Sequence, residues 1–224
     1  MEININGEPF VFEEENLSYA STKPMTHEEG KAILFKAKEL FDSVGLHFYL
    51  GYGTLLGAIR EHDFIKGDED VDVFTNDEKK LRDNLPYFHK KGLRVIRAVA
   101  GNTYSFKYGE GGYIDVYILK SIPWYSPWSY SCYSISNHEY VPKKLFMEFE
   151  KIEFLGGTFE CPKNPEKVLE FLYGKDWRTP VRGHKFYYEV KSAYYYHKVV
   201  IPFIKKILFY DKWYSYIKKC LYNI

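Results

Sequence analysis

Residues 53–60 read Gly-Thr-Leu-Leu-Gly-Ala-Ile-Arg, and residues 68–73 read Asp-Glu-Asp-Val-Asp-Val. The first segment predicts a small-residue turn that opens a short helix, because glycine permits tight backbone conformations. The second segment is an acidic run that passes into alternating aspartate and valine, the pattern of a half-buried strand. Successive side chains of a strand point to opposite faces. Asp70 and Asp72 are therefore expected side by side on one face, with the two valines packed behind them.

This pair of carboxylates predicts a metal site. Two negative charges on one strand face repel each other unless a cation lies between them. Oxygen ligands suit Mg²⁺ (or Mn²⁺), and Mg²⁺ takes one or two carboxylates together with substrate phosphates. The backbone N–H groups of Gly53 and Thr54, at the start of a helix, are candidates for binding such a phosphate. The sequence thus predicts a metal site at Asp70 and Asp72, with a phosphate site about fifteen residues earlier.

Four further charged residues each have two interpretations. Arg60 lies two helical turns after Gly53, where its guanidinium either clamps a phosphate with two hydrogen bonds or pairs with the acidic run. Asp68 and Glu69 either orient the metal ligands or form the polar entry to the strand. Lys144, next to a second lysine, either meets a phosphate or belongs to a solvated pair. Arg60 and Lys144 are therefore candidate donor-binding residues, and the two acidic residues are candidate supports of the site.

Asp115 stands alone in an apolar strand pattern, Tyr-Ile-Asp-Val-Tyr-Ile, over residues 113–118. A carboxylate in a buried strand is costly unless it is paired or bound to a metal. The minority interpretation is an aspartate at the edge of a sheet.

The other segments predict a mixture of helices and strands. Thr26 and Glu29 form a capping box ahead of an amphipathic pattern, and Gly45 is placed to end that helix. Pro86 interrupts a charged helix over residues 77–91. The remaining expected elements are a hairpin over residues 3–14, strands over 46–50, 93–100 and 103–108, a helix over 165–173 capped by Asn164 and Gly174, and a helix over 199–221.

The stretch over residues 124–140 is rich in Trp, Tyr, Ser and Pro, which indicates an irregular loop. Its aromatic side chains either stack on a sugar ring or nucleobase, or anchor the loop to the protein. Around a choline-type headgroup, aromatic faces also add a cation–π attraction of ~0.5–2 kcal/mol each. The aromatic residues in question are Trp124, Tyr125, Trp128 and Tyr130.

Composition narrows the classes of function. A chain of 224 residues suffices for one sizeable core, and a net charge of +1 gives no general attraction to nucleic acid. Three widely separated cysteines argue against a zinc cluster or a disulfide framework and favour a reducing compartment. The N-terminal residues lack the basic and apolar regions of a secretory signal, and no apolar run approaches ~18 residues. These features predict a cytoplasmic protein without a nucleic-acid partner.

The two opening segments resemble the nucleotidyltransferase fold superfamily, whose signature is a Gly-Gly/Ser/Thr turn, a spacer and an Asp-x-Asp pair on the next strand. The finer resemblance is to the LicD family, which includes bacterial phosphocholine transferases and is related to fukutin and fukutin-related protein. Lys66-Gly67 stand where that family usually has Pro-Trp, which alters the rim of the site and leaves the metal pair intact. The segments that carry the resemblance, in the order of the family, are residues 53–60, 64–65, 68–72, 141–146, 154–157, 161–165 and 172–180.

The resemblance implies an α+β (α/β-like) fold, with a nucleotidyltransferase-type mixed central sheet flanked by helices and a C-terminal helical extension. It implies a catalytic domain over residues 26–185. The residues outside that domain predict an N-terminal hairpin or extension over 1–25 and a basic aromatic helical extension over 186–224. The resemblance makes Asp115 a third carboxylate beside the metal pair, where taking a proton from an acceptor hydroxyl is favoured over ligating the metal. Asp176, in the block Tyr-Gly-Lys-Asp-Trp, is expected to support the site indirectly.

The function implied is a Mg²⁺-dependent transferase that moves phosphocholine or a polyol phosphate from a CDP-linked donor, such as CDP-choline, to a hydroxyl of a cell-surface glycan. The alternatives are a nucleotidyltransferase that uses an NTP and releases pyrophosphate, and a glycan-binding module without catalysis. Acceptors of such transferases are often lipid-linked. The basic aromatic helix expected over residues 199–221 is therefore interpreted as a peripheral contact with the inner face of the membrane, with packing on its own domain or on a dimer partner as the alternative.

Overall fold

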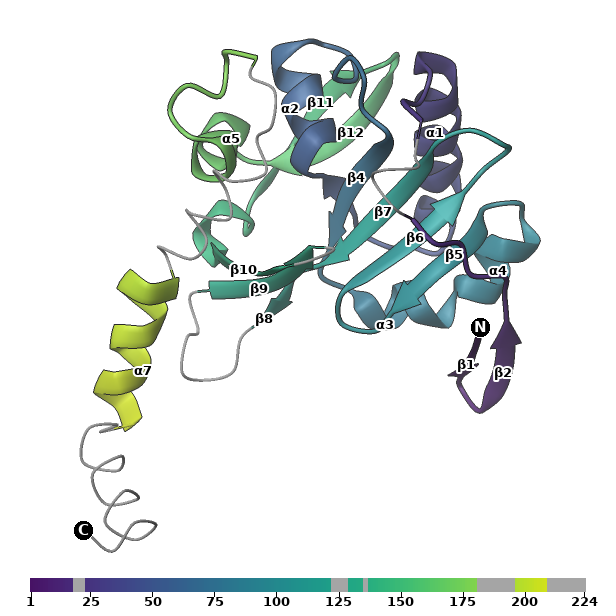
Figure 1. The fold of residues 1–224 in the computed structure, drawn as a ribbon, viewed down its shortest axis with the longest axis horizontal. Coiled ribbons are helices and arrows are strands. Elements are labelled where there is room, and N and C mark those ends of the chain that lie inside the picture. The colour runs from purple at the N-terminus through teal and green to yellow at the C-terminus, as the bar shows by residue number, and fades with distance from the viewer. Residues whose placement is uncertain (18–22, 122–128, 135–136, 181–195, 209–224) are drawn as a thin grey trace, which may run out of the picture.

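The computed structural model describes residues 1–17, 23–121, 129–134, 137–180 and 196–208. Its centre is a five-stranded sheet in the order β3-β4-β7-β6-β5 (Figure 1). Strands β4 and β7 pair in parallel, and the other neighbours pair antiparallel, so the sheet is mixed. The expected α+β class is confirmed, whereas the expected domain boundaries stay a prediction. The strands of this sheet are β3 (Tyr49–Leu50), β4 (Asp70–Thr75), β5 (Arg94–Val99), β6 (Thr103–Lys107) and β7 (Tyr113–Ile118).

Helix α1 (His27–Ser43) starts as its sequence predicts. The Thr26 side chain accepts a hydrogen bond from the Glu29 N–H, and the Glu29 side chain accepts one from the Thr26 N–H. After Val44 the chain leaves the helix through Gly45, which has a φ of +64°. This left-handed conformation favours glycine.

One face of the sheet is covered by α1 and by the pair α3 (Glu78–Asp83) and α4 (Leu85–Lys90), which are separated near Pro86 as expected. Phe41 of α1 and Phe88 of α4 both meet Phe106 of β6, with ring centroids 6.1 Å apart in each case. The valine and isoleucine side chains of β4 and β7 face these helices, and they form the main core together with α1.

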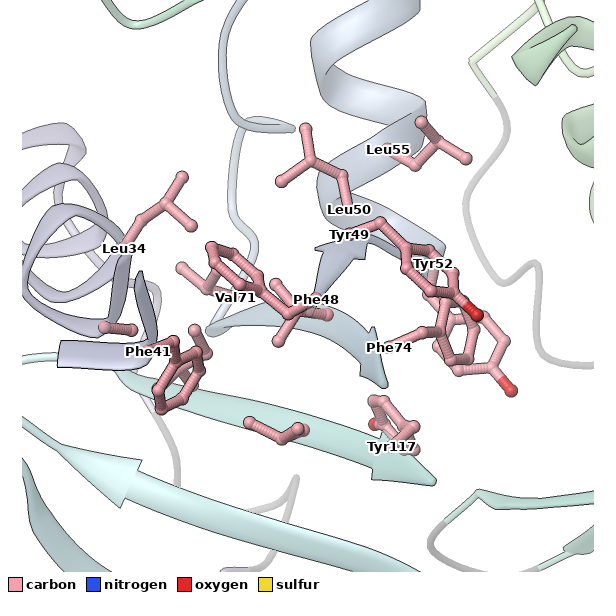
Figure 2. Packing of buried hydrophobic residues seen from close by; sticks show 14 of the residues in the cluster. Leu34, Phe41, Phe48, Tyr49, Leu50, Tyr52, Leu55, Val71, Phe74 and Tyr117 are labelled. Atoms are coloured by element: carbon pink, nitrogen blue, oxygen red, sulfur yellow. The ribbon is translucent and has the colours of Figure 1, made fainter. Parts of the chain in front are cut away.

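On the opposite face of the sheet, α2 (Tyr52–Arg60) packs against β4 (Figure 1). Tyr52 packs against Phe74 of β4 and Tyr117 of β7, with ring centroids 4.7 and 4.9 Å away (Figure 2). As a result all six residues of β4 are buried. The expectation of a half-buried strand was wrong, because β4 is a central strand with a helix on each face. The strand expected over residues 46–50 is also shorter, since only Tyr49 and Leu50 pair with β4.

The prediction of an irregular loop over residues 124–140 was wrong for the part of this stretch that the structure describes. Strands β8 (Lys120–Ser121), β9 (Ser129–Ser134) and β10 (Asn137–Pro142) form an antiparallel sheet in the order β10-β9-β8. Serine and tyrosine make up most of β9, so its sequence has no apolar alternation to indicate a strand. Trp124, Tyr125 and Trp128 lie outside the described residues.

A hairpin and a helix complete this half of the chain. The short helix η1 (Lys143–Leu145) leads into the hairpin of β11 (Phe149–Phe154) and β12 (Gly157–Pro162), which is followed by α5 (Pro165–Tyr173). Asn164 occupies the position before α5, but its side chain makes no capping hydrogen bond, so this expectation was wrong. Its backbone is left-handed, with φ 61° and ψ 59°, which differs from the extended conformation of a capping residue. Gly174 ends α5 with a φ of +97°, as expected.

The two ends of the described chain are short elements. The hairpin of β1 (Glu2–Ile5) and β2 (Glu8–Val11) turns at Asn6 and Gly7 as predicted. At the other end, η2 (Tyr196–Val200) continues into α7 (Ile201–Leu208), which Figure 1 shows standing apart from the central sheet. Residues 209–221 of the expected C-terminal helix lie outside the described residues. Within the described part of the chain, no helix combines the length and apolar character needed to cross a membrane.

Candidate functional site

A row of polar side chains crosses four strands of the central sheet in direct register. Asp72 of β4 lies opposite Asp115 of β7, which lies opposite Ser105 of β6, which lies opposite Arg97 of β5. Side chains alternate along a strand, so the row occupies the face away from α1, and Asp70 lies on the same face. The structure therefore brings Asp70, Asp72 and Asp115 together, and the place of Asp115 is the one that the family resemblance implied.

The start of α2 is bonded to the strand that carries the carboxylates. The Gly53 N–H donates to Asp72 Oδ2 at 2.9 Å, and the Asp72 N–H donates to Thr54 Oγ1 at 2.8 Å. The Gly51 N–H donates to the Asp72 carbonyl oxygen at 3.0 Å. Thr54 is fully buried, so its hydroxyl serves the strand. In this arrangement the Gly53 N–H binds a carboxylate of the protein, and binding of phosphate by Gly53 and Thr54 stays a prediction.

Tyr52 takes an unusual backbone conformation between these glycines, with a φ of +29°. Few residues other than glycine adopt a positive φ, and non-glycine residues that do so concentrate at functional sites. The packing of the Tyr52 ring against Phe74 and Tyr117 holds it there (Figure 2). This conformation begins the helix and directs the next N–H, that of Gly53, to Asp72.

The carboxylates of β4 carry poorly compensated negative charge. Asp70 and Asp72 are 6% and 7% exposed. Burial raises the pKa of Asp70 well above its ordinary value, and Asp115 and Asp68 raise it further. Burial likewise raises the pKa of Asp72, with added repulsion from Asp70 and Asp68. Burial also raises the pKa of Asp68 to about 6. A divalent cation would relieve this repulsion.

The residues present fit a two-carboxylate metal site. The described residues contain no group of three or more His, Cys, Asp or Glu side chains that could together hold one metal ion. The pair Asp70 and Asp72 nevertheless suits Mg²⁺, since that ion is often held by one or two carboxylates and completes its shell with water and substrate phosphate oxygens. These two residues are the ones that could hold a metal.

The Asp115 carboxylate accepts hydrogen bonds from other side chains, which the sequence did not reveal. This carboxylate is fully buried, and Arg97 Nη2 donates to Oδ1 at 2.9 Å and to Oδ2 at 2.7 Å. Ser105 Oγ donates to Oδ1 at 2.5 Å, and the Tyr117 hydroxyl donates to Oδ2 at 3.3 Å. Burial raises the pKa of Asp115, while Arg97, Ser105 and Tyr117 oppose that rise. Sequence reasoning missed these three partners, and Ser105, which stands between two aromatic residues of β6, gave the one signal.

Arg60 lies at the far end of α2 and does not pair with the acidic run. Its Nε donates to Glu61 Oε1 at 2.7 Å, and its Nη1 donates to the Trp177 carbonyl oxygen at 3.0 Å. Trp177 is buried, and the Arg178 guanidinium lies 4.2 Å from the centroid of its ring. Arg60 thus connects α2 to the turn that follows α5.

The other predicted residues lie outside the row. Asp176 is exposed in the turn after α5, where its carbonyl oxygen accepts a hydrogen bond from the Thr179 N–H at 2.8 Å. Lys144 is exposed in η1. Asp68 and Glu69 precede β4, and the Asp68 carboxylate lies beside Gly53, where it would be 2.9 Å from an added Cβ. Asp68 therefore belongs to the carboxylate cluster.

Arg60→Ala is expected to lower the stability of the fold by about 1–2 kcal/mol, because a largely buried guanidinium and its bond to Trp177 are lost. This corresponds to a fall in melting temperature of about 2–8 °C for a chain of this size. Lys163→Ala, which removes an exposed ion pair with Glu148, is the control and should change stability little. A variant Arg60→Ala that melts like the wild type but binds a CDP-linked donor more weakly would instead support the phosphate-clamp interpretation.

The stability of the metal-free protein is expected to fall as pH rises from about 4 to 7, because Asp68, Asp70 and Asp72 lose their protons in the folded state. The folded-state pKa of Asp68, about 6, lies above its unfolded value of about 3.9, so its contribution is complete below pH 3.9 and is lost as pH rises through 6. Asp70 and Asp72 act in the same direction. Melting curves in EDTA at pH 5 and 7.5 test this, with Asp68→Asn as the control that should show a smaller fall. Adding Mg²⁺ should stabilise the protein more at pH 7.5 than at pH 5, and an equal effect at both would contradict the expectation.

Comparison with known families adds one match. The family model described as LicD/FKTN/FKRP, nucleotidyltransferase domain, matches residues 45–164, just over half of the 224 residues. The matched region contains the start of α2, the carboxylate pair, Asp115 and Arg97. No curated protein matches the chain.

Three solved structures are similar to this chain. Lincosamide antibiotic adenylyltransferase LnuA with lincomycin bound is 13% identical, with a TM-score of 0.44 over 62% of this chain and 84% of that one. The solution structure of the antibiotic-resistance factor ANT(2'')-Ia is 12% identical, with a TM-score of 0.46 over 89% of this chain and 100% of that one. A crystal structure of ANT(2'')-Ia with adenylyl-2''-tobramycin is 15% identical, with a TM-score of 0.43 over 78% and 94% of the two chains.

Proposed function

The chain belongs to the LicD/FKTN/FKRP family, which supports a phospho-substituent transferase in general, and we propose that it moves phosphocholine or a polyol phosphate from a CDP-linked donor to a glycan hydroxyl. The observation that carries this proposal is the buried pair Asp70 and Asp72, in register with Asp115 and bonded to the start of a helix. Phosphoryl-group chemistry needs positioning and charge stabilisation more than a protein nucleophile. A buried carboxylate pair that attracts a divalent cation supplies the means for both.

Each residue of the site has a defined task in this proposal. Asp70 and Asp72 would hold Mg²⁺, and the ion would supply positive charge to offset that of the donor phosphates and of CMP as it leaves. The Gly53 N–H fixes the orientation of the Asp72 carboxylate, and the positive end of the α2 dipole lies beside that charge. Thr54 fixes the register between α2 and β4 through its bond to the Asp72 N–H. These contacts pre-organise the pair before any donor arrives.

In this proposal, Asp115 takes a proton from the acceptor hydroxyl only after one of its present hydrogen bonds has broken. Its two oxygens accept four hydrogen bonds, which fill the roughly four lone-pair sites of a carboxylate. A proton from an acceptor hydroxyl needs one of these sites. The general-base role that the sequence favoured therefore requires one of these partners to move away when the acceptor binds.

The proposal is tested by incubating the purified chain with a CDP-linked donor and with CTP, side by side, and separating the products by mass spectrometry. The donors are CDP-choline, CDP-glycerol and CDP-ribitol, each with Mg²⁺ and with EDTA, and a panel of glycans serves as acceptor. Release of CMP from a CDP-linked donor, dependent on Mg²⁺ and coupled to a glycan carrying the new group, is the expected result. Release of pyrophosphate from CTP would replace the proposal with nucleotidyl transfer. Binding of a glycan with no turnover of any donor would replace it with a binding module.

A further inference from the structure

Arg97 reaches the carboxylate row because of an irregularity in its strand. Val95 lies opposite Phe106, yet the next residue to lie opposite β6 is Arg97, which faces Ser105. Ile96 is therefore an extra residue, as in a β-bulge, and it is buried. Without this insertion Ile96 would face Ser105, and Arg97 would point to the apolar face. Bulges often redirect a side chain next to a functional site.

The contacts of Arg97 serve Asp115 specifically. Its Nε donates to Ser105 Oγ at 2.8 Å, and its Nη2 contacts both Asp115 oxygens. Lys107, two residues from Ser105 on the same strand face, pairs instead with Glu15 at 2.8 Å. Arg97 is 14% exposed, so the ion pair is screened little by solvent.

We propose that Arg97 is a positioning residue that withholds Asp115 from metal ligation, so that Asp70 and Asp72 alone supply the carboxylate ligands. This inference rests on the proposed function, since it assumes a divalent cation at that pair. The geometry supports it in two ways. All four lone-pair sites of Asp115 are filled, and the described residues hold no group of three acidic or other ligands around one position. Arg97 thus sets how many carboxylates the metal meets.

Removing the guanidinium should release Asp115 to the metal. In Arg97→Gln, titration calorimetry with MnCl₂ should show tighter binding than in the wild type by about tenfold or more, because affinity rises with the number of charged ligands. Arg97→Lys keeps the positive charge, but a lysine ammonium makes fewer hydrogen bonds to Asp115 than the planar guanidinium. A smaller rise in Mn²⁺ affinity, of a few-fold, is therefore expected. Arg94→Gln, on the same strand and 3.8 Å from Glu15, is the matched control and should bind Mn²⁺ like the wild type.

The double variant Arg97→Gln with Asp115→Asn separates this effect from a general loosening of the sheet. Its Mn²⁺ affinity should return to that of the wild type, and circular dichroism should show each variant folded. Unchanged or weaker Mn²⁺ binding in Arg97→Gln, or tight binding that persists in the double variant, would overturn the inference. Arg97→Lys provides the same decision if Arg97→Gln does not fold. A wild-type chain that binds no Mn²⁺ would overturn the metal site of the proposed function itself, which is a distinguishable result.

Discussion

Asp70→Asn combined with Asp72→Asn is expected to abolish Mg²⁺-dependent release of CMP from a CDP-linked donor, by a factor of at least about 10³. Loss of a single group that stabilises charge in a transition state costs about 10²–10³ in rate, and this change removes both carboxylate ligands of the metal. The fold should survive. Burial raises the pKa of each carboxyl because the charged form is costly there, and asparagine carries no charge. The amide oxygen at position 72 can still accept from the Gly53 N–H.

The control for this experiment is Asp42→Asn combined with Asp83→Asn. It removes the same charge from two residues that pair with Lys38 and Lys79 on helices α1 and α3. Its turnover should match that of the wild type. Turnover retained in the Asp70 and Asp72 variant, with the protein folded, would eliminate the proposed mechanism.

Gly53→Ala should remove most of the activity while leaving the fold stable. A Cβ at this position would lie 2.9 Å from Asp68 Oδ2 and 3.2 Å from Asp72 Oδ2, so both carboxylates must shift. The ends of these side chains can move at low cost to the fold, and alanine favours a helix over glycine by about 1 kcal/mol. The metal site, however, depends on where those oxygens lie, and displacements of about 1 Å can cost about 10²-fold in rate. The rate of transfer and the melting temperature, measured together, check this expectation.

Gly57→Ala, in the same helix, is the contrasting variant. Its Cβ would lie 2.5 Å from the Asp63 carbonyl oxygen and 3.1 Å from the Ile65 backbone nitrogen, which are backbone atoms and cannot step aside. It should lower the melting temperature, whereas Gly53→Ala should not. If Gly53→Ala instead unfolds the protein, or leaves the rate unchanged, the placement of Gly53 against the carboxylates is wrong.

The parts of the site that could be predicted are those in which local sequence and tertiary packing agree. Asp70 and Asp72 have strand periodicity, so their shared face followed from alternation alone. The place of Asp115 beside them was implied by the family resemblance, since it depends on how β7 pairs with β4. Thr26 and Gly45 likewise carry the residue types that begin and end a helix, and the structure has them there.

The errors arise where pairing across the sheet decides the outcome. The burial of both faces of β4 depends on the packing of α2 against the strand. The pattern of residues within β4 does not indicate this contact. The position of Arg97 depends on the extra residue Ile96 in β5, and this irregularity exists only relative to β6. Strands β9 and β10 stabilise each other through backbone pairing with few aliphatic side chains, so they were predicted as a loop. Arg60 was expected either to clamp a phosphate or to pair with the acidic run, yet its Nη1 bonds the carbonyl oxygen of Trp177, 117 residues away in the sequence.

The central claim is that Asp70 and Asp72 form a divalent-cation site, and electron paramagnetic resonance of Mn²⁺ tests it without knowledge of donor or acceptor. Mn²⁺ titrated into the metal-free wild-type chain should lose its free-ion signal as the site fills, and Mg²⁺ should restore that signal by competition. In the variant with Asp70→Asn and Asp72→Asn, the free-ion signal should appear from the first addition. Equal Mn²⁺ binding by the wild type and by this variant would contradict the claim.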